Sequence, residues 1–368
     1  MNPIRRSAVI AVTSGVAVAS LALPTTALAK APKSPKTHDA SAAAAGFLAR
    51  SLVGKHHDHF TGSYVSDGKT VTYVNYGETA DAILSMDAAG VAQAAAKRAT
   101  TYLEAHAGAY AGTSGDTYSP GAIGKLLLVA EAQHVKVTDF GGVDLVNALQ
   151  ATEGARGAAV GEYQQNAAGT PEDFLYFSTV GQALPVLALA SAGSAAQPDA
   201  AAVSFLEGQQ CPDGGYPSQL QSDAATACQA GGDVDSTAYA AQALLAVGSP
   251  AATASLEWLR THQHSNGSLG RPGNANSTAI AIEAFVAGKN KAARAKARKW
   301  LVSRQLGCSV KASGRGAVAF AAKKNALSAN ELPTTVLATS QAGVALAGLS
   351  LAQVDKKGSH RAAPRLKC

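Results

Sequence analysis

Residues 205–216 read FLEGQQCPDGGY, residues 258–269 read WLRTHQHSNGSL, and residues 300–305 read WLVSRQ. In each stretch an aromatic residue is followed directly by leucine and, five positions after the aromatic, by glutamine. Aromatic-leucine pairs also occur at Phe47-Leu48 and Tyr102-Leu103, and Ala148-Leu149 falls where a third copy is expected. Recurrence of one pattern along a chain is the signature of a repeat fold. The sequence therefore predicts six copies of one helical unit.

A second helix is predicted after each copy, beyond a polar or glycine-rich loop. The six predicted starts are Gly77-Glu78-Thr79-Ala80, Ser119-Pro120-Gly121-Ala122, Phe177-Ser178-Thr179-Val180, Asp235-Ser236-Thr237-Ala238, Asn276-Ser277-Thr278-Ala279 and Pro333-Thr334-Thr335-Val336. Short polar side chains satisfy the free N–H groups of a first turn, and proline suits the first helical position. Four of these helices should end at Gly90, Gly193, Gly248 and Gly288, because glycine favours helix C-termini.

These second helices are apolar nearly all round, as residues 238–247, 279–287 and 336–351 illustrate. A helix without a polar face must be buried, whereas the first helices carry charges such as Glu257 and Arg298. We therefore predict an all-α fold, an α6/α6 toroid with an inner and an outer ring of helices and no β-sheet. The inner helices should run in one direction, so that six N-termini form one rim that favours anions. An open α-solenoid is the alternative.

The chain divides into four predicted parts. Residues 1–29 resemble a signal peptide, with Arg5 and Arg6 before an apolar run and small residues at Ala27 and Ala29. A membrane anchor is the alternative, but the run is short for a spanning helix. Residues 30–39 are predicted as a flexible linker, 40–354 as the toroid, and 355–368 as a basic tail. We therefore expect a secreted or envelope-associated, extracytoplasmic protein without a transmembrane segment after cleavage.

Charge and cysteine content suggest the environment of the protein. The whole chain has a formal charge of +6, and removal of two signal arginines leaves +4. Residues 284–368 hold 16 Lys/Arg against two acids, so this third could face an anionic wall or lipid surface, or simply be a solvated helix face. The four cysteines suggest disulfides in an exported protein. Cys211 and Cys228 flank one loop and are the natural pair, which leaves Cys308 for Cys368.

The stretches 210–216 and 263–269 resemble the Gln–Gly–aromatic repeat of the prenyltransferase and squalene-oxidase repeat families. The residues Asp233-Val234-Asp235-Ser236-Thr237-Ala238 resemble the start of an inner helix in the same superfamily. This resemblance covers most of residues 40–354 and implies the α/α-toroid fold. The superfamily includes terpenoid cyclases, protein prenyltransferase β-subunits, complement thioester domains and cobalamin carriers of the transcobalamin type. Because these proteins range from enzymes to carriers, the function must be argued from the site.

Asp233 and Asp235 are the sharpest enzymatic signal. They resemble the Asp-x-Asp-Asp motif of class II terpenoid cyclases, which implies Asp235 as the catalytic acid and Asp233 as its neighbour. Such an acid must stay protonated in a desolvated site. The chain departs from the motif at Ser236 and has few aromatic residues to stabilise a carbocation. The alternative interpretation is that Asp235 caps a helix and Asp233 pairs nearby.

Two other motifs give weaker indications of function. The cluster His56-His57-Asp58-His59 could bind a metal weakly but is more simply a polar loop. The segment Leu332-Pro333-Thr334-Thr335 resembles a wall-sorting signal, but polar residues interrupt the following apolar run, so we interpret it as the sixth inner helix. We expect no metal, no cofactor and no nucleic-acid partner, and a monomer.

Three functions remain open. The first is a non-catalytic module that binds an apolar or anionic small ligand at the mouth of the inner ring. The second is a class II terpenoid cyclase-like enzyme, and the third is an envelope-associated module that binds a cell-envelope polymer through its basic third. The side chains predicted at the mouth are Tyr239, Thr237, Asn276, Thr179 and Glu78.

Overall fold

The computed structural model describes residues 35–113, 118–154, 160–164, 178–192, 196–220, 224–321, 327–328, 331–356 and 362–368. The predicted signal peptide therefore lies outside the described residues. Residues 34–368 pack as one unit. Within the described ranges, every helix is too short or too polar to cross a lipid bilayer.

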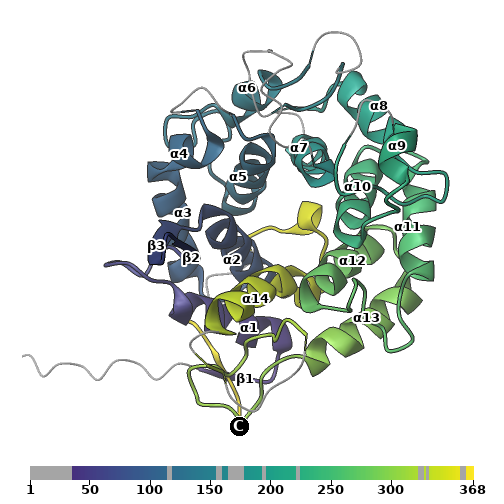
Figure 1. The fold of residues 1–368 in the computed structure, drawn as a ribbon. Helices are drawn as coiled ribbons and strands as arrows, with labels where there is room; N and C mark the ends of the chain where they lie inside the picture. The colour runs from purple at the N-terminus through teal and green to yellow at the C-terminus, as the bar shows by residue number, and fades with distance from the viewer. Residues whose placement is uncertain are drawn as a thin grey trace, which may run out of the picture. The chain divides into compact units, whose positions relative to one another are not determined.

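Six helices form an inner ring (Figure 1). They are α2 (Tyr76–Ala89), α5 (Pro120–Gln133), α7 (Thr179–Ser191), α10 (Val234–Ala246), α12 (Ala275–Ala287) and α14 (Leu332–Ala347). Each packs against the next along the chain, and α14 packs against α2, so the ring is closed. The predicted toroid is thereby confirmed, and the open solenoid is excluded.

Six further helices cover the inner ring from outside (Figure 1). They are α1 (Ala40–Ser51), α3 (Gln93–Ala105), α6 (Leu145–Gln150), α8 (Ala200–Gly208), α11 (Ala252–Thr261) and α13 (Lys291–Ser303). Every aromatic-leucine pair of the repeat lies in one of these outer helices, and its leucine is fully buried. Two short helices, α4 (Ala107–Ala111) and α9 (Ala224–Cys228), lie in connecting segments.

The repeated glutamine joins neighbouring units. The amide nitrogen of Gln263 donates to the carbonyl of Gly267 in its own loop and to that of Ala293 in the next outer helix, both at 3.1 Å. Gln305 does the same with Gly316 at 2.9 Å and with Ala40 at 2.8 Å. Since Ala40 begins the first outer helix, the last copy of the motif closes the ring.

A repeated threonine holds the loop before the inner helix. The hydroxyl of Thr237 accepts the N–H of Tyr216 at 2.9 Å, and that of Thr278 accepts the N–H of Leu269 at 2.9 Å. These loop N–H groups are buried and would otherwise lack a partner. The Ser/Thr positions that mark the helix starts therefore satisfy the loops that enter them.

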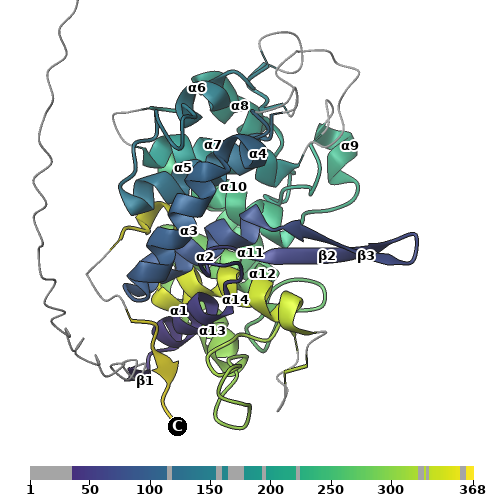
Figure 2. The ribbon, with the colours of Figure 1, turned by 90° about the vertical axis from the view of Figure 1, so that its left-hand side faces the viewer.

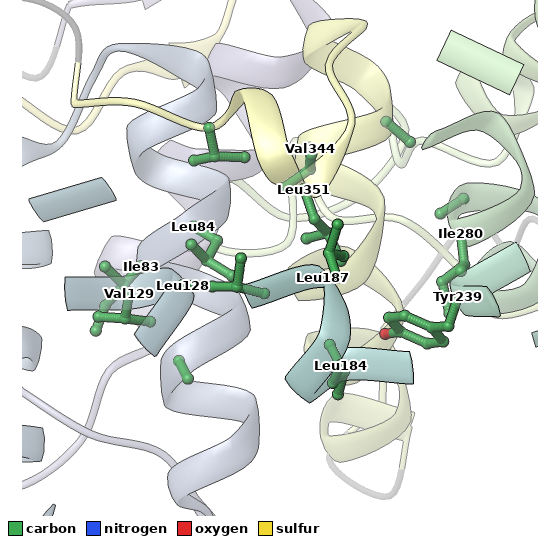
Figure 3. Packing of buried hydrophobic residues seen from close by; sticks show 14 of the residues in the cluster. Ile83, Leu84, Leu128, Val129, Leu184, Leu187, Tyr239, Ile280, Val344 and Leu351 are labelled. Atoms are coloured by element: carbon green, nitrogen blue, oxygen red, sulfur yellow. The ribbon is translucent and has the colours of Figure 1, made fainter. Parts of the chain in front are cut away.

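The sixth inner helix is shorter than predicted. It begins at Leu332, as expected, but ends at Ala347, because Gly348 adopts a left-handed conformation with φ of 77°. The apolar run continues to Leu351, which instead starts a short 3₁₀ helix, η5 (Leu351–Gln353). This segment turns back into the ring, where Leu351 lies beside Leu84, Leu128, Leu187 and Val344 (Figure 3).

The expectation of a fold without β-sheet is wrong in detail. Strands β2 (Thr61–Ser66) and β3 (Lys69–Val74) form an antiparallel hairpin between α1 and α2. Figure 2 shows this hairpin projecting from the helical body. An Asp67-Gly68 turn between alternating side chains is a strong hairpin signal, and both turn residues have positive φ. Because the hairpin lies outside both rings, the fold class is unaffected.

Both ends of the described chain meet at one place. Strand β1 (Lys36–Thr37) pairs in parallel with β4 (Arg365–Leu366), and a disulfide joins Cys308 to Cys368. We call these two strands and this disulfide the terminal clasp. The end of the predicted linker and the end of the predicted tail are thus part of the folded unit. The second disulfide joins Cys211 to Cys228, so both pairs favoured by the sequence are present.

Candidate functional site

A buried ion pair lies inside the inner ring. The ammonium of Lys125 (α5) lies 2.8 Å from a carboxylate oxygen of Asp81 (α2), and the two side chains are 16% and 12% exposed. Tyr239 on α10 and Glu283 on α12 interact electrostatically with this pair. Asp81, Lys125 and Tyr239 each occupy the sixth position of their helix. Their meeting at one level agrees with inner helices that run in the same direction.

Burial dominates the protonation of this group. Burial raises the pKa of Glu283 well above its ordinary range, and the charge of Asp81 adds to this effect. Burial alone would lower the pKa of Lys125, but Asp81 and the neighbouring tyrosines more than offset it, so the pKa is raised. Lys125 therefore stays charged, while Glu283 favours its neutral form.

The described residues leave little space inside the ring at the level of this ion pair. The cavity at this level has a volume of about 10 Å³. Its lining residues are Asp81, Leu84, Tyr239, Ile280, Glu283, Ser340, Gln341, Val344 and Leu351. A single water needs roughly 10–15 Å³ of such space. The centre of the ring can therefore hold about one water and no organic ligand in this conformation.

One helical turn towards the N-terminal ends lies the mouth of the ring, which we define by Glu78, Asp235 and Asn276. Asp235 precedes Tyr239 by four residues and Asn276 precedes Ile280 by four, so each lies on the helix face that lines the cavity below. One side-chain oxygen in each of the three residues is buried and accepts no hydrogen bond within the described structure.

The mouth is acidic and partly protonated near neutral pH. Burial raises the pKa of Glu78 to about 7, and Asp81 contributes to the rise. Burial likewise raises the pKa of Asp235 to about 6, although a hydrogen bond from Ser277 opposes the shift. Asn276 donates through its amide to the side-chain oxygen of Gln341 at 2.5 Å. The mouth therefore presents hydrogen-bond acceptors and neutral acids rather than a cationic anion site.

The two aspartates of the cyclase-like motif have separate surroundings. Asp233 is the N-cap of α10, and its carboxylate accepts the N–H of Ser236 at 2.9 Å. Asp235 lies in the first turn and faces the mouth. The alternative interpretation had assigned the cap to Asp235 and is wrong on that point. The helix-capping role belongs to Asp233, because a cap must precede the first helical residue.

Two of the predicted mouth residues serve the fold instead. Thr237 is fully buried and donates to the carbonyl of Asp233 at 2.6 Å. Thr179 is also fully buried and donates to the carbonyl of Pro217 at 2.6 Å. Both hydroxyls point towards loops, so only Tyr239, Asn276 and Glu78 of the predicted set face the ring interior.

The histidine cluster does not converge. His59 contacts the carboxylate of Asp58 at 2.7 Å and stacks on Tyr102, with ring centroids 4.3 Å apart. His57 contacts the carbonyl of Leu52 at 3.0 Å, and His56 is exposed. Across the described ranges, no three metal-capable side chains meet in one place.

Two much larger cavities lie outside the ring centre. One, of about 890 Å³, lies beside α1 and the terminal clasp, and we call it the clasp pocket. The other, of about 860 Å³, lies along α3 and includes Lys97, Arg98 and Tyr102. Neither was predicted, because each is built from segments that are distant in the sequence.

Sequence reasoning also missed the polar residues within the inner helices. Asp81, Lys125 and Glu283 lie in inner helices that the sequence pattern predicts to be apolar nearly all round. A charged side chain in a buried helix is normally paired with an opposite charge. Each of these residues could therefore have indicated a buried ion pair from the sequence alone.

Comparisons with known proteins support the fold and leave the activity open. No known family model and no curated protein matches this sequence. Among solved structures, an unsaturated glucuronyl hydrolase from Bacillus sp. GL1 is 12% identical, with 84% of this chain and 95% of that one covered at a TM-score of 0.56. The type II terpene cyclase MstE from Scytonema is 14% identical. The match covers 84% of this chain and 96% of that one, with a TM-score of 0.51. The ent-copalyl diphosphate synthase from Streptomyces platensis is 19% identical, with a TM-score of 0.47, and this chain spans only 52% of its length. The protein thus shares the α/α-toroid fold with glycan hydrolases and terpene cyclases.

Proposed function

We propose that the protein is an exported, non-catalytic binding protein whose small ligand contacts the mouth of the inner ring. The observation that carries this proposal is the set of three buried oxygens on Glu78, Asp235 and Asn276 that accept no hydrogen bond. Leaving a buried acceptor unsatisfied costs roughly 1–3 kcal/mol for each group. A ligand that supplies donors would remove this cost.

The chemistry of the mouth selects a ligand that donates hydrogen bonds. Three helices contribute acceptor oxygens, and Asp81 lies one turn below them. Hydroxyl and ammonium groups are the donors that carboxylates and amide oxygens recognise. The anionic ligand expected from six helix N-termini fits less well, because acidic side chains already occupy the first turns of α2 and α10.

The size of the central cavity argues against an enclosed reaction chamber. Ligand pockets for drug-sized molecules span roughly 300–1,000 Å³, whereas the ring centre offers about 10 Å³. The raised pKa of Asp235 supports the alternative of a class II terpenoid cyclase-like enzyme. That alternative requires the apolar residues Leu84, Leu351 and Val344 to move out of the ring centre.

A binding screen with two mouth variants tests the proposal. Hydroxyl-rich glycans, polyamines, corrinoids and isoprenoid diphosphates are added separately, and the shift in melting temperature is measured. We expect a glycan or polyamine to stabilise the wild type, and Asn276→Leu and Glu78→Gln to reduce that shift. Thr237→Val, which lies nearby but faces a loop, serves as the control for altered stability. Conversion of an isoprenoid that stops in Asp235→Asn would overturn the proposal in favour of the enzyme.

A separate observation favours attachment to the cell envelope. Lys289, Lys291, Lys296 and Lys299 are exposed along or just before α13, and none of them forms an ion pair within the described residues. Such an uncompensated basic face attracts anionic polymers in a salt-dependent way. Neutralising the four lysines should abolish salt-sensitive retention on isolated cell walls. Unchanged retention would reject envelope binding and leave the mouth proposal intact.

The extracytoplasmic location is part of the same proposal. The predicted signal peptide motivates it, and the two disulfides support it, because disulfides persist in oxidising compartments. Sequencing the N-terminus of protein recovered from culture medium or the cell envelope tests it. A start at Lys30 is expected, whereas retention of Met1 would contradict cleavage.

A further inference from the structure

The clasp pocket is a built cavity that the proposed function does not use. It has a volume of about 890 Å³, which is the size of a pocket for a small organic ligand. The end of α1, the loop around residues 309–314 and strand β4 supply its walls. Hydrogen bonds from Arg50 to the carbonyls of Ala363 (3.3 Å) and Pro364 (2.8 Å) hold the C-terminal segment against α1.

The charges in this pocket are of one sign. Arg50, Lys311 and Arg365 line it, and none of the described lining residues is acidic. Burial, together with the charge of Arg365, lowers the pKa of Arg50 to about 10. A pocket whose described charged lining residues are all cations favours an anionic ligand.

Among these three cations, Arg50 has hydrogen-bond donors that remain unsatisfied. Its Nη1 group holds the C-terminal segment, while Nε and Nη2 are buried and lack any acceptor in the described structure. These two nitrogens form the edge of the guanidinium that binds carboxylate or phosphate in a bidentate manner. Both nitrogens are shielded from bulk water, so Arg50 adds buried positive charge to the pocket that it lines. Lys311 and Arg365 line the same pocket.

The rest of the pocket is apolar. Phe47, Leu52, Val310, Leu327 and Leu332 line it. Leu332 is 40% exposed, so part of this apolar wall is open to solvent. A cationic end beside apolar walls matches a molecule with an anionic head and an apolar body.

We propose that the clasp pocket binds a soluble amphipathic anion, with its carboxylate or phosphate head at Lys311 and Arg365 and its apolar body against Leu332 and Leu327. This site is independent of the mouth of the ring. It depends on the terminal clasp, because Arg365 lies on β4 and the disulfide Cys308–Cys368 fixes the same segment.

Isothermal titration of the full disulfide-bonded protein with octyl phosphate tests the proposal. Octyl phosphate should bind at least about tenfold more tightly than either inorganic phosphate or the neutral octyl glucoside, because only it satisfies both parts of the pocket. Phosphate binding as tightly as octyl phosphate would contradict the apolar subsite, and octyl glucoside doing so would contradict the anion subsite. Binding to phosphatidylglycerol vesicles without binding of octyl phosphate would overturn the soluble ligand in favour of a membrane surface.

Charge-matched variants complete the test. The double variant Lys311→Gln/Arg365→Gln should weaken octyl phosphate binding by at least about tenfold, and Leu332→Ser should weaken it less. The control is Lys97→Gln/Arg98→Gln, which removes two charges from the cavity of similar volume along α3. Equal loss in both double variants, with circular dichroism showing intact folding, would show that binding follows net charge and would overturn the site. Asp235→Asn should leave octyl phosphate binding unchanged, which separates this site from the mouth.

Discussion

The centre of the ring and the terminal clasp differ in a way that the repeat pattern does not suggest. The repeats converge on the ring centre, yet that centre is filled by an ion pair, a neutral acid and leucine side chains around about 10 Å³ of space. The clasp lies outside the repeats, yet the pocket beside it has a volume of about 890 Å³ and is lined by cations and apolar groups. A repeat fold thus specifies where its axis lies but not whether the axis is hollow.

The two regions are also stabilised differently. The ring centre depends on buried electrostatics, in which Lys125 compensates Asp81 beside Glu283. The clasp depends on covalent and backbone links between chain ends, namely Cys308–Cys368 and the pairing of β1 with β4. Substitutions in each region should therefore have different signatures, which the following experiments compare.

The largest effect is expected from Lys125→Met. This change leaves the carboxylate of Asp81 buried without a cation, and removal of one partner from a buried ion pair costs as much as about 5 kcal/mol. Urea denaturation should show this loss, and Asp81→Asn/Lys125→Met should recover much of it. A double variant as unstable as the single one would mean that the ion pair does not stabilise the ring centre.

Next is removal of the clasp disulfide by Cys308→Ser/Cys368→Ser. The sequence separation is 60 residues, and the chain-entropy model gives a loss of about 4 kcal/mol. Cys211→Ser/Cys228→Ser, with a separation of 17, should cost about 3 kcal/mol by the same model. Guanidinium denaturation measures both. If the clasp variant lost less stability than its shorter-loop counterpart, the clasp would not be a principal constraint on the chain ends.

The third effect is a dependence of stability on pH that originates in the ring. The folded pKa values of Glu78 and Asp235 are raised to about 7 and about 6, from ordinary values of 4.5 and 3.8. The folded state thus binds more protons than the unfolded state between about pH 4 and 7, so stability is full below pH 4 and falls as pH rises through this window. Glu78→Gln should remove up to about 3 kcal/mol of this dependence, measured by urea denaturation across pH. An unchanged pH profile in that variant would contradict the buried, protonated state of Glu78.

The smallest effect compares two equivalent glutamines. Gln305→Ala removes two hydrogen bonds that link the last unit to the first, and Gln263→Ala removes two that link adjacent units. Each change should cost about 2 kcal/mol in thermal or chemical denaturation. Because Gln305 also closes the ring, we expect faster amide exchange in both α1 and α13 in that variant. An increase in amide exchange that is confined to one of these two helices would indicate that ring closure does not depend on the side chain of Gln305.

Much of the fold could be predicted because the same local helix signals recur in successive repeat units. Aromatic-leucine pairs, helix caps such as Ser119 and Ser178, and glycine C-caps such as Gly90 are local signals, and they identified both helix rings. The end of α14 was missed because apolar residues on both sides of Gly348 masked the helix stop. The hairpin was missed because it lies between two repeat helices, where the helical pattern carries no signal for strands.

The site could be predicted only in part. The helix starts indicate where Tyr239, Asn276 and Glu78 lie along the inner helices, but their role at a ligand mouth stays a prediction, as does the role of Asp235 as an acid. Thr237 was misassigned, because sequence alone does not show whether a hydroxyl turns towards a loop or towards the mouth. The clasp pocket depends on contacts between α1 and residues more than 250 positions away. The Gln305–Ala40 and Arg50–Pro364 hydrogen bonds are examples. No local sequence pattern can therefore predict this pocket.

A ligand that binds at the mouth should be released from the protein chemically unchanged. The most direct measurement is to incubate the protein with pooled glycans, polyamines, corrinoids and isoprenoid diphosphates, recover the bound compound, and compare its mass before and after. We expect a donor-rich compound to be recovered with unchanged mass from the wild type and to be absent from Asn276→Leu. Recovery of a chemically altered isoprenoid, lost in Asp235→Asn, would contradict the account.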